Sequence, residues 1–295
     1  MMQLIKGNTY YYDSISSQGG YCLNDQWLII DTGGDDSSAK KSIRAMENPD
    51  IKYIFNTHSH ADHCGGNAYF EKRFAPTIIA PFVEDKFIEA PILEPIYFYG
   101  AAPPEALKNK FLYVKPSTVA MALKDTSPLT LAFSEDEATF EVIALSGHAP
   151  NMMGIITPDR VAFIGDALLG DSFLEKHALM FTYDVAKHLE TLETLKTVSA
   201  DAFILSHGGL KTDILPLIEA NRSSLLQVSE AIFNHCKGHT ITFDHLHHQL
   251  YNQLNLNENL SSHLLNRSVI RAHVQYLEAL GELSFVVNQG QLFIE

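Results

Sequence analysis

The sequence predicts a mixed α/β (α+β) protein with one large domain and a second, smaller one. Its 295 residues exceed the usual size of a single domain. Short β-like runs separated by Gly and Asn turns fill residues 3–30, and strand and helix patterns alternate after them. Hydrophobic residues make up 46% of the chain, which is enough to bury a sizeable core.

Strands are predicted from short apolar, β-branched and aromatic runs. The first three runs suit the antiparallel start of a sheet: residues 9–12, 21–23 and 27–30. Later runs of this kind lie at residues 51–55, 129–133, 139–145, 154–157, 161–164 and 202–205.

Helices are predicted at residues 37–46, where Asn48-Pro49 ends the pattern, and at residues 67–74. Residues 184–198 form an amphipathic helix, because Val185, Leu189 and Leu192 fall on one stripe. Asp184 is the expected cap of this helix.

The larger domain is predicted to span residues 1–212 and the smaller one residues 213–295. The smaller domain is expected to contain helices at 213–236, from Asp244 onward and at 262–280, then a β-hairpin at 282–295. Three helices and a terminal hairpin resemble a winged-helix module. Such modules often bind DNA, but this segment has four basic and eight acidic residues. We therefore interpret it as a structural cap or a dimerisation element.

Net charge and cysteine content narrow the possible partners and the cellular location. The formal net charge of −14 disfavours nucleic acid and anionic membranes, which need clustered Lys and Arg. Cys22, Cys64 and Cys236 are too few and too scattered for a disulfide framework. Residues 1–7 lack the long apolar core of a signal peptide, and no apolar run approaches the length of a membrane span. We expect a cytoplasmic protein that acts on a small molecule.

Residues 57–66, Thr-His-Ser-His-Ala-Asp-His-Cys-Gly-Gly, carry the strongest chemical signal. They follow the strand at 51–55 and contain three imidazoles and one carboxylate. His58 and His60 are two residues apart, so in an extended loop both side chains leave the same side. Asp62 and His63 follow where the chain turns towards a helix and can face a second ion. Imidazole with carboxylate suits zinc, and also iron or manganese.

Three more candidate ligands each follow an apolar run further along the chain: His148, Asp166 and His207. Side chains placed at the ends of strands sit on a rigid edge, which favours a metal site. Cys64 is interpreted as a small packed residue beside this loop rather than a ligand or nucleophile.

The ordered set of motifs resembles the metallo-β-lactamase-fold superfamily of hydrolases over roughly residues 3–212. The segment Leu28-Ile29-Ile30-Asp31-Thr32-Gly33 is part of this resemblance. It implies a four-layer αββα sandwich and a glyoxalase II-like two-metal ligand set. The first metal would be held by His58, His60 and His148, the second by Asp62, His63 and His207, with Asp166 bridging both. Asp31 would either shape its turn or support the metal loop from behind.

The resemblance implies a binuclear hydrolase with two divalent ions, zinc or else iron or manganese. A two-metal-bound hydroxide, oriented by Asp62, would attack a small ester, thioester, lactone or phosphoester. β-Lactamases of the main zinc class place Cys where Asp166 stands, so antibiotic hydrolysis is not expected. Flavodiiron proteins place Glu where His60 stands, so oxygen-reducing di-iron chemistry is not expected either. Persulfide dioxygenases share these motifs but use one iron, so such an oxidoreductase is the alternative. A phosphodiesterase or ribonuclease is opposed by the net charge.

Residues 81–128 hold seven of the twelve prolines and look like an insertion. Two roles stay open for it: a lid that lines the substrate pocket, or a flap that packs on a second subunit of a homodimer. No single substrate-binding residue can be named. Other polar side chains are interpreted as solvated surface: Asp171, Glu175, Lys176, His177, His245, His247 and His248.

Overall fold

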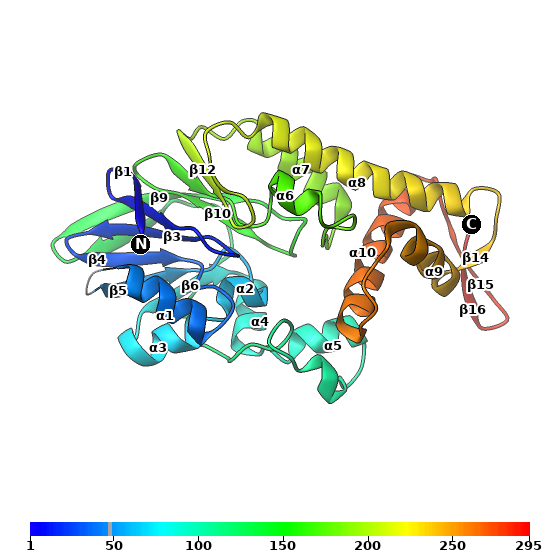
Figure 1. The fold of residues 1–295 in the computed structure, drawn as a ribbon, viewed down its shortest axis with the longest axis horizontal. Coiled ribbons are helices and arrows are strands. Elements are labelled where there is room, and N and C mark those ends of the chain that lie inside the picture. Colours follow the sequence, from blue (N-terminus) through cyan, green and yellow to red (C-terminus); the bar gives the residue numbers. More distant parts are fainter. Residues whose placement is uncertain (47–48) are drawn as a thin grey trace.

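The computed structural model describes residues 1–46 and 49–295, so the predicted helix end at Asn48 lies outside the described residues. Two β-sheets lie within residues 3–211. Figure 1 shows this sandwich on the side of the N-terminus and a group of helices with a small sheet on the side of the C-terminus.

The first sheet has seven strands in the order β1-β2-β3-β4-β5-β6-β7. Their bounds are β1 Gln3–Lys6, β2 Thr9–Tyr12, β3 Gln18–Leu23, β4 Gln26–Ile30, β5 Asp50–Phe55, β6 Thr77–Pro81 and β7 Met121–Leu123. Strands β1 to β4 pair antiparallel, and β4 to β7 pair parallel.

The second sheet has six strands in the order β13-β12-β11-β10-β9-β8. Their bounds are β8 Leu129–Phe133, β9 Asp136–Ala144, β10 Met153–Ile156, β11 Val161–Phe163, β12 Ala202–Leu205 and β13 Gly209–Lys211. Strand β9 begins at Asp136, earlier than the predicted strand at 139–145, so the turn after β8 is short.

Successive side chains of a strand point to opposite faces of the sheet, so each strand contributes to the layers on both sides. Leu28 and Ile30 of β4 join the core between the two sheets, whereas Ile29 faces the helices outside the first sheet. That outer face is covered by α1 (Asp36–Ala45) and α3 (Asn67–Phe74). The predicted four-layer αββα sandwich is confirmed.

The outer face of the second sheet is covered by α7 (Val185–Leu195) and α8 (Leu215–Cys236). The short helix α6 (Asp171–Leu174) contacts α8. The cap predicted for α7 is confirmed, since the Asp184 carboxylate accepts a hydrogen bond from the Lys187 backbone N–H at 3.0 Å.

Residues 81–128 contain more regular structure than a long loop. They form α4 (Glu84–Glu89), α5 (Leu93–Tyr99), the 3₁₀ helix η1 (Glu105–Leu107) and β7. Strand β7 pairs with β6 and adds the seventh strand to the first sheet, which the proline-rich pattern did not predict. An apolar cluster of Phe98, Leu107 and Leu112 packs against α10, so this segment reaches from the sandwich to the C-terminal helices (Figure 1).

The C-terminal residues form α8, α9 (Phe243–Leu254) and α10 (Leu260–Ala279) around their own apolar core. A small antiparallel sheet in the order β14-β16-β15 completes this part. Its strands are β14 Ile241–Thr242, β15 Phe285–Asn288 and β16 Gln291–Ile294. The predicted helices and hairpin are confirmed, and β14 is an additional strand.

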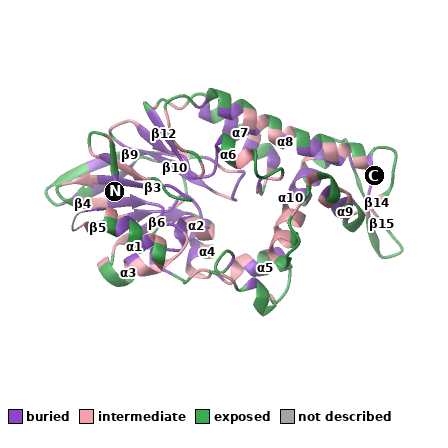
Figure 2. Ribbon diagram, in the orientation of Figure 1, coloured by how far each residue is buried: buried purple, intermediate pink, exposed green. Residues whose placement is uncertain are grey.

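The expectation that His247 is solvated is wrong. His245 and His248 are exposed, but His247 is only 6% exposed and its ring centroid lies 4.5 Å from that of His263 on α10. His247 lies four positions after the buried Phe243, so the helical period turns it towards α10. Figure 2 shows buried residues along the inner faces of these helices.

Within residues 1–46 and 49–295, none of the helices combines the length and apolarity that crossing a membrane requires.

We expect Phe140→Ala to lower the free energy of unfolding by about 3–5 kcal/mol, because it opens a cavity between the two sheets. Phe140 is fully buried and meets Tyr21 edge to face at a centroid distance of 5.1 Å. Denaturant unfolding measures the change. The matched control is Glu141→Ala at the next, exposed position of β9, which should stay within about 0.5 kcal/mol of the parent. Equal effects of the two variants would contradict this placement of the core.

Candidate metal centre

The candidate ligands lie in loops that follow strands of both sheets and in the short helix that continues one of these loops. The loop after β5 carries His58 and His60 and leads into the short helix α2 (Ala61–Cys64). His148 follows β9, Asp166 follows β11 and His207 follows β12. Because these strand ends meet at one edge of the sandwich, the side chains converge although they are far apart in sequence.

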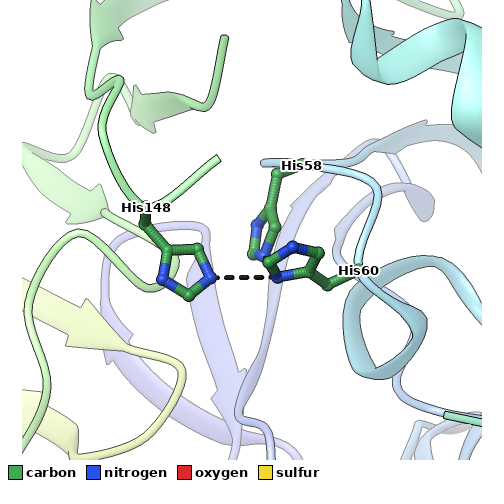
Figure 3. Close-up of side chains that lie close together, drawn as sticks. All are labelled: His58, His60 and His148. Atoms are coloured by element: carbon green, nitrogen blue, oxygen red, sulfur yellow. Dashed lines mark hydrogen bonds between the residues drawn. The ribbon is translucent and has the colours of Figure 1, made fainter. Parts of the chain in front are cut away.

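His58, His60 and His148 form the first group of candidate ligands. The His60 Nδ1 atom lies 3.0 Å from His58 Nε2 and 3.0 Å from His148 Nε2. Figure 3 shows the three rings pointing towards one another. Burial lowers the pKa of His58 and His148 well below the usual histidine value and that of His60 to about 4. All three imidazoles are therefore neutral at pH 7, which is the form that binds a metal ion.

Asp62, His63, Asp166 and His207 form the second group. The His207 Nε2 atom lies 3.0 Å from Asp62 Oδ2 and 3.4 Å from Asp166 Oδ2. The His63 Nε2 atom lies 3.5 Å from Asp166 Oδ1. The Asp166 carboxylate also lies 3.6 Å from His148 Nε2, so it joins the two groups.

Two buried atoms of this cluster lack a hydrogen-bond partner among the described residues: His63 Nε2 and Asp166 Oδ1. An unpaired buried polar atom is costly, and such atoms point to an ion or other ligand. Imidazole nitrogens and carboxylate oxygens are also the donors that zinc, iron and manganese accept. The arrangement therefore fits divalent metal ions.

Charge pairing dominates the electrostatics of the second group. Burial favours the neutral carboxyl, but His63 and His207 outweigh it and lower the pKa of Asp62 to about 2. The same two histidines hold the pKa of Asp166 well below its usual value against the effect of burial. Both carboxylates are charged at pH 7 and available to a cation.

The second ring nitrogen of four candidate ligands is also held, which fixes the orientation of each ring. The contacts are His58 Nδ1 to Thr57 Oγ1 at 3.1 Å, His63 Nδ1 to Asp31 Oδ2 at 2.8 Å, His148 Nδ1 to the Phe181 carbonyl at 3.1 Å and His207 Nδ1 to the Ile15 carbonyl at 2.9 Å. The backbone carbonyls of Ile15 and Phe181 carried no signal in the sequence.

Asp31 combines both roles that the sequence left open. Its backbone has a positive φ of 57°, as a turn requires, and its carboxylate contacts the metal loop. Oδ1 accepts a hydrogen bond from the Thr57 backbone N–H at 2.8 Å, and Oδ2 accepts one from the Thr57 hydroxyl at 2.8 Å.

Glu84 at the start of α4 supports the same loop and was not singled out by the sequence. Its Oε2 atom accepts hydrogen bonds from the Ser59 backbone N–H at 3.1 Å and hydroxyl at 2.7 Å. Its Oε1 atom accepts one from the Asn151 backbone N–H at 3.0 Å. Burial raises the pKa of this carboxyl. Glu84 thereby ties the loop that carries His60 to the loop that carries His148.

A cavity of 190 Å³ borders both ligand groups. Aromatic and aliphatic side chains from distant segments form most of its wall: Phe111, Leu112, Leu169, Phe173, Phe181 and Leu265. A larger open groove of 780 Å³ lies between α9 and α10, but it contains none of the candidate ligands. The smaller cavity is therefore the one in which a bound molecule would contact the ligand groups.

The family profile of the Metallo-beta-lactamase superfamily matches residues 19–207, which include all seven candidate ligands. The chain belongs to this superfamily. It is 28% identical over 144 residues to "Hydroxyacylglutathione hydrolase GloC" of Haemophilus influenzae, covering 48% of this chain and 60% of that one. It is 26% identical over 186 residues to "Beta-lactamase-like protein 2 homolog" of Caenorhabditis elegans, covering 61% and 52%. The matches thus span little more than half of these relatives.

Solved structures share the fold of this metallo-beta-lactamase superfamily member over nearly its whole length. A metallo-beta-lactamase family protein from Thermus thermophilus superimposes with a TM-score of 0.73 at 18% identity, over 97% of this chain and 98% of that one. A beta-lactamase domain protein from Burkholderia ambifaria has a TM-score of 0.75 at 16% identity, over 99% and 93%. At these identities the likeness concerns the fold alone.

The charged residues after Asp166 do not join the centre. Four side chains are exposed, as expected: Asp171, Glu175, Lys176 and His177. Cys64 is buried, and its thiol donates a hydrogen bond to the Ser59 carbonyl at 3.0 Å. Burial raises the pKa of this thiol well above its usual value, which disfavours the thiolate that a ligand or nucleophile needs.

We expect Glu84→Ala to destabilise the protein by about 3 kcal/mol, because it leaves buried donors of Ser59 and Asn151 without an acceptor. Thermal unfolding measures the loss. Glu89→Ala in the same helix is the control, since Glu89 pairs with Lys86 at the surface and should contribute less than about 1 kcal/mol. A Glu84→Ala variant as stable as the Glu89→Ala variant would show that Glu84 does not support the loop.

Proposed function

We propose that this chain is a hydrolase whose seven clustered side chains hold two divalent metal ions. The position of Asp166 between the two ligand groups carries the proposal, because the two oxygens of one carboxylate could contact two neighbouring ions. His58, His60, His148 and Asp166 would hold one ion, and Asp62, His63, His207 and Asp166 the other. Zinc suits this donor set, and iron or manganese are the other candidates.

The protein side chains would bind, orient and shield the reactants. When bound, the ions supply Lewis acidity that polarises a carbonyl or phosphoryl oxygen and lowers the pKa of water to about 7. The Asp62 side chain is 42% exposed and lines the cavity, so its carboxylate can orient an attacking water. Phe173 and Phe181 exclude bulk water from one side. The proposed substrates are small esters, thioesters, lactones or phosphoesters.

The alternative is an oxidoreductase that uses one iron, as in persulfide dioxygenases. The second ligand group supports the hydrolase instead, because its four donor atoms all lie within 4.8 Å of one another and two of them are carboxylates. A nuclease is disfavoured by the same net charge of −14 that argues against nucleic acid as a partner.

We also propose that residues 1–212 form the catalytic domain and residues 213–295 an accessory domain, in a protein that acts in the cytoplasm. Support comes from the separate apolar core of α8, α9 and α10. Leu265 of α10 lines the cavity, so the accessory domain contributes to the substrate site. Contact between Phe98 and the region of Leu265 favours the lid role of residues 81–128 over the flap of a homodimer.

We expect Asp166→Ala to reduce the metal content from about two ions per chain to one or fewer and to lower kcat/KM by more than about 100-fold. The metal content is measured by mass spectrometry on protein purified without added metal. Asp171→Ala, at an exposed aspartate nearby, should keep both ions. Two ions and normal activity in Asp166→Ala would refute the bridging role, and one iron per chain in the parent would support the oxidoreductase.

We expect metal affinity to rise with pH. Burial opposes the charged imidazole, but Asp166 and Asp62 raise the pKa of His207 to about 10 and that of His63 well above its usual value. An ion binds neutral imidazole, so it must displace these protons. The apparent affinity for zinc should increase at least about tenfold per pH unit between about pH 6 and 8. Competition with a chelator measures it, and a flat profile would contradict the pairing of these groups.

A further inference from the structure

The wall of the cavity beside the ligand groups has an unusual composition. Apart from the candidate ligands, one polar side chain lines it, that of Glu94 on α5. In the part of the chain that the structure describes, neither Lys nor Arg contributes to this wall. The remaining wall is aromatic or aliphatic. A substrate therefore meets an apolar surface and a single carboxyl group.

The carboxyl group of Glu94 is also unpaired in the described part of the chain. Among the described residues, its carboxyl group makes neither a hydrogen bond nor an ion pair. The charged groups that act on it are acidic, since Glu84 and Asp62 add to the effect of burial and raise its pKa to about 8. Glu94 also lines a small adjoining hollow of 30 Å³ between Phe98, Tyr97 and Tyr183. It stands between two apolar regions and faces the space where a ligand would bind.

The metal ions themselves would leave little net positive charge for an anionic substrate. Two divalent ions bring four positive charges, and the carboxylates of Asp31, Asp62 and Asp166 offset three of them. An anionic group beside the reacting bond would find no cationic side chain in the wall and would lose its hydration.

We propose that this cavity selects uncharged, largely apolar acyl substrates, and that Glu94, which lines its wall among aromatic and aliphatic side chains, helps to select them. As a neutral carboxyl group, Glu94 can donate a hydrogen bond to a carbonyl, ether or hydroxyl oxygen of the substrate. This inference rests on the proposed hydrolase function and narrows its substrates to neutral esters, thioesters and lactones. It removes phosphoesters from the candidates.

The test uses two thioesters with the same acyl group and the same scissile bond. S-hexanoyl-N-acetylcysteamine is neutral, and S-hexanoyl-2-mercaptoethanesulfonate is anionic with a sulfonate that coordinates metal ions weakly. We expect the zinc-loaded protein to favour the neutral thioester in kcat/KM by at least about tenfold. Equal rates, or a preference for the sulfonate, would overturn the proposal.

Two variants place a cation in the wall at different positions. Glu94→Lys replaces the carboxyl group, and Phe111→Lys changes a side chain that is 70% exposed, which the fold can tolerate. Each should reduce the preference for the neutral thioester by about tenfold. Glu105→Lys makes the same charge change at an exposed position of the same segment and should leave the preference unchanged. A preference unaffected by both wall variants would exclude charge as its cause.

Binding of the corresponding thioethers separates this inference from the hydrolase proposal. S-hexyl-N-acetylcysteamine and S-hexyl-2-mercaptoethanesulfonate cannot be hydrolysed, and calorimetry measures their affinities for the zinc-loaded protein. Tighter binding of the neutral thioether without turnover of either thioester would support the selectivity of the cavity and refute the hydrolase. Turnover of both thioesters with equal binding of both thioethers would support the hydrolase and refute the selectivity.

Discussion

The Asp31 carboxylate connects the fold to the candidate metal centre. Asp31 follows β4, and it binds the loop after β5 through the backbone and hydroxyl of Thr57 and the ring of His63. Strands β4 and β5 pair in parallel, so their carboxyl ends lie side by side and one carboxylate reaches both loops. Because Thr57 in turn contacts His58, rings of both ligand groups depend on Asp31.

The convergence of charge at this edge favours a bound cation. Three carboxylates and five imidazoles lie together, and two of their buried atoms have no partner among the described residues. Such a cluster is unfavourable without an ion, because buried charges must be paired and hydrogen-bonded. The free energy of metal binding therefore contributes to the stability of these loops. Metal binding and the folding of these loops therefore depend on the same residues.

The ligands and the cavity wall have different structural origins. Loops of the sandwich and the short helix α2 hold the candidate ligands, whereas much of the wall comes from residues 81–128 and from α10. Superfamily members can thus share metal chemistry while differing in substrate, since the two depend on different segments. In this chain, Glu94 and Phe111 of residues 81–128 line the same cavity as the candidate ligands.

Local patterns in the sequence predicted most elements and the ligand types. The helical stripe of α7, its cap Asp184 and the spacing of His58 and His60 involve neighbouring residues, so sequence alone determines them. The tertiary structure decided the contacts between distant segments, such as the support of Ser59 by Glu84 and the placement of Glu94. It also buried His247 and paired β7 with β6. These depend on which surfaces meet when the chain closes, and no local pattern specifies that.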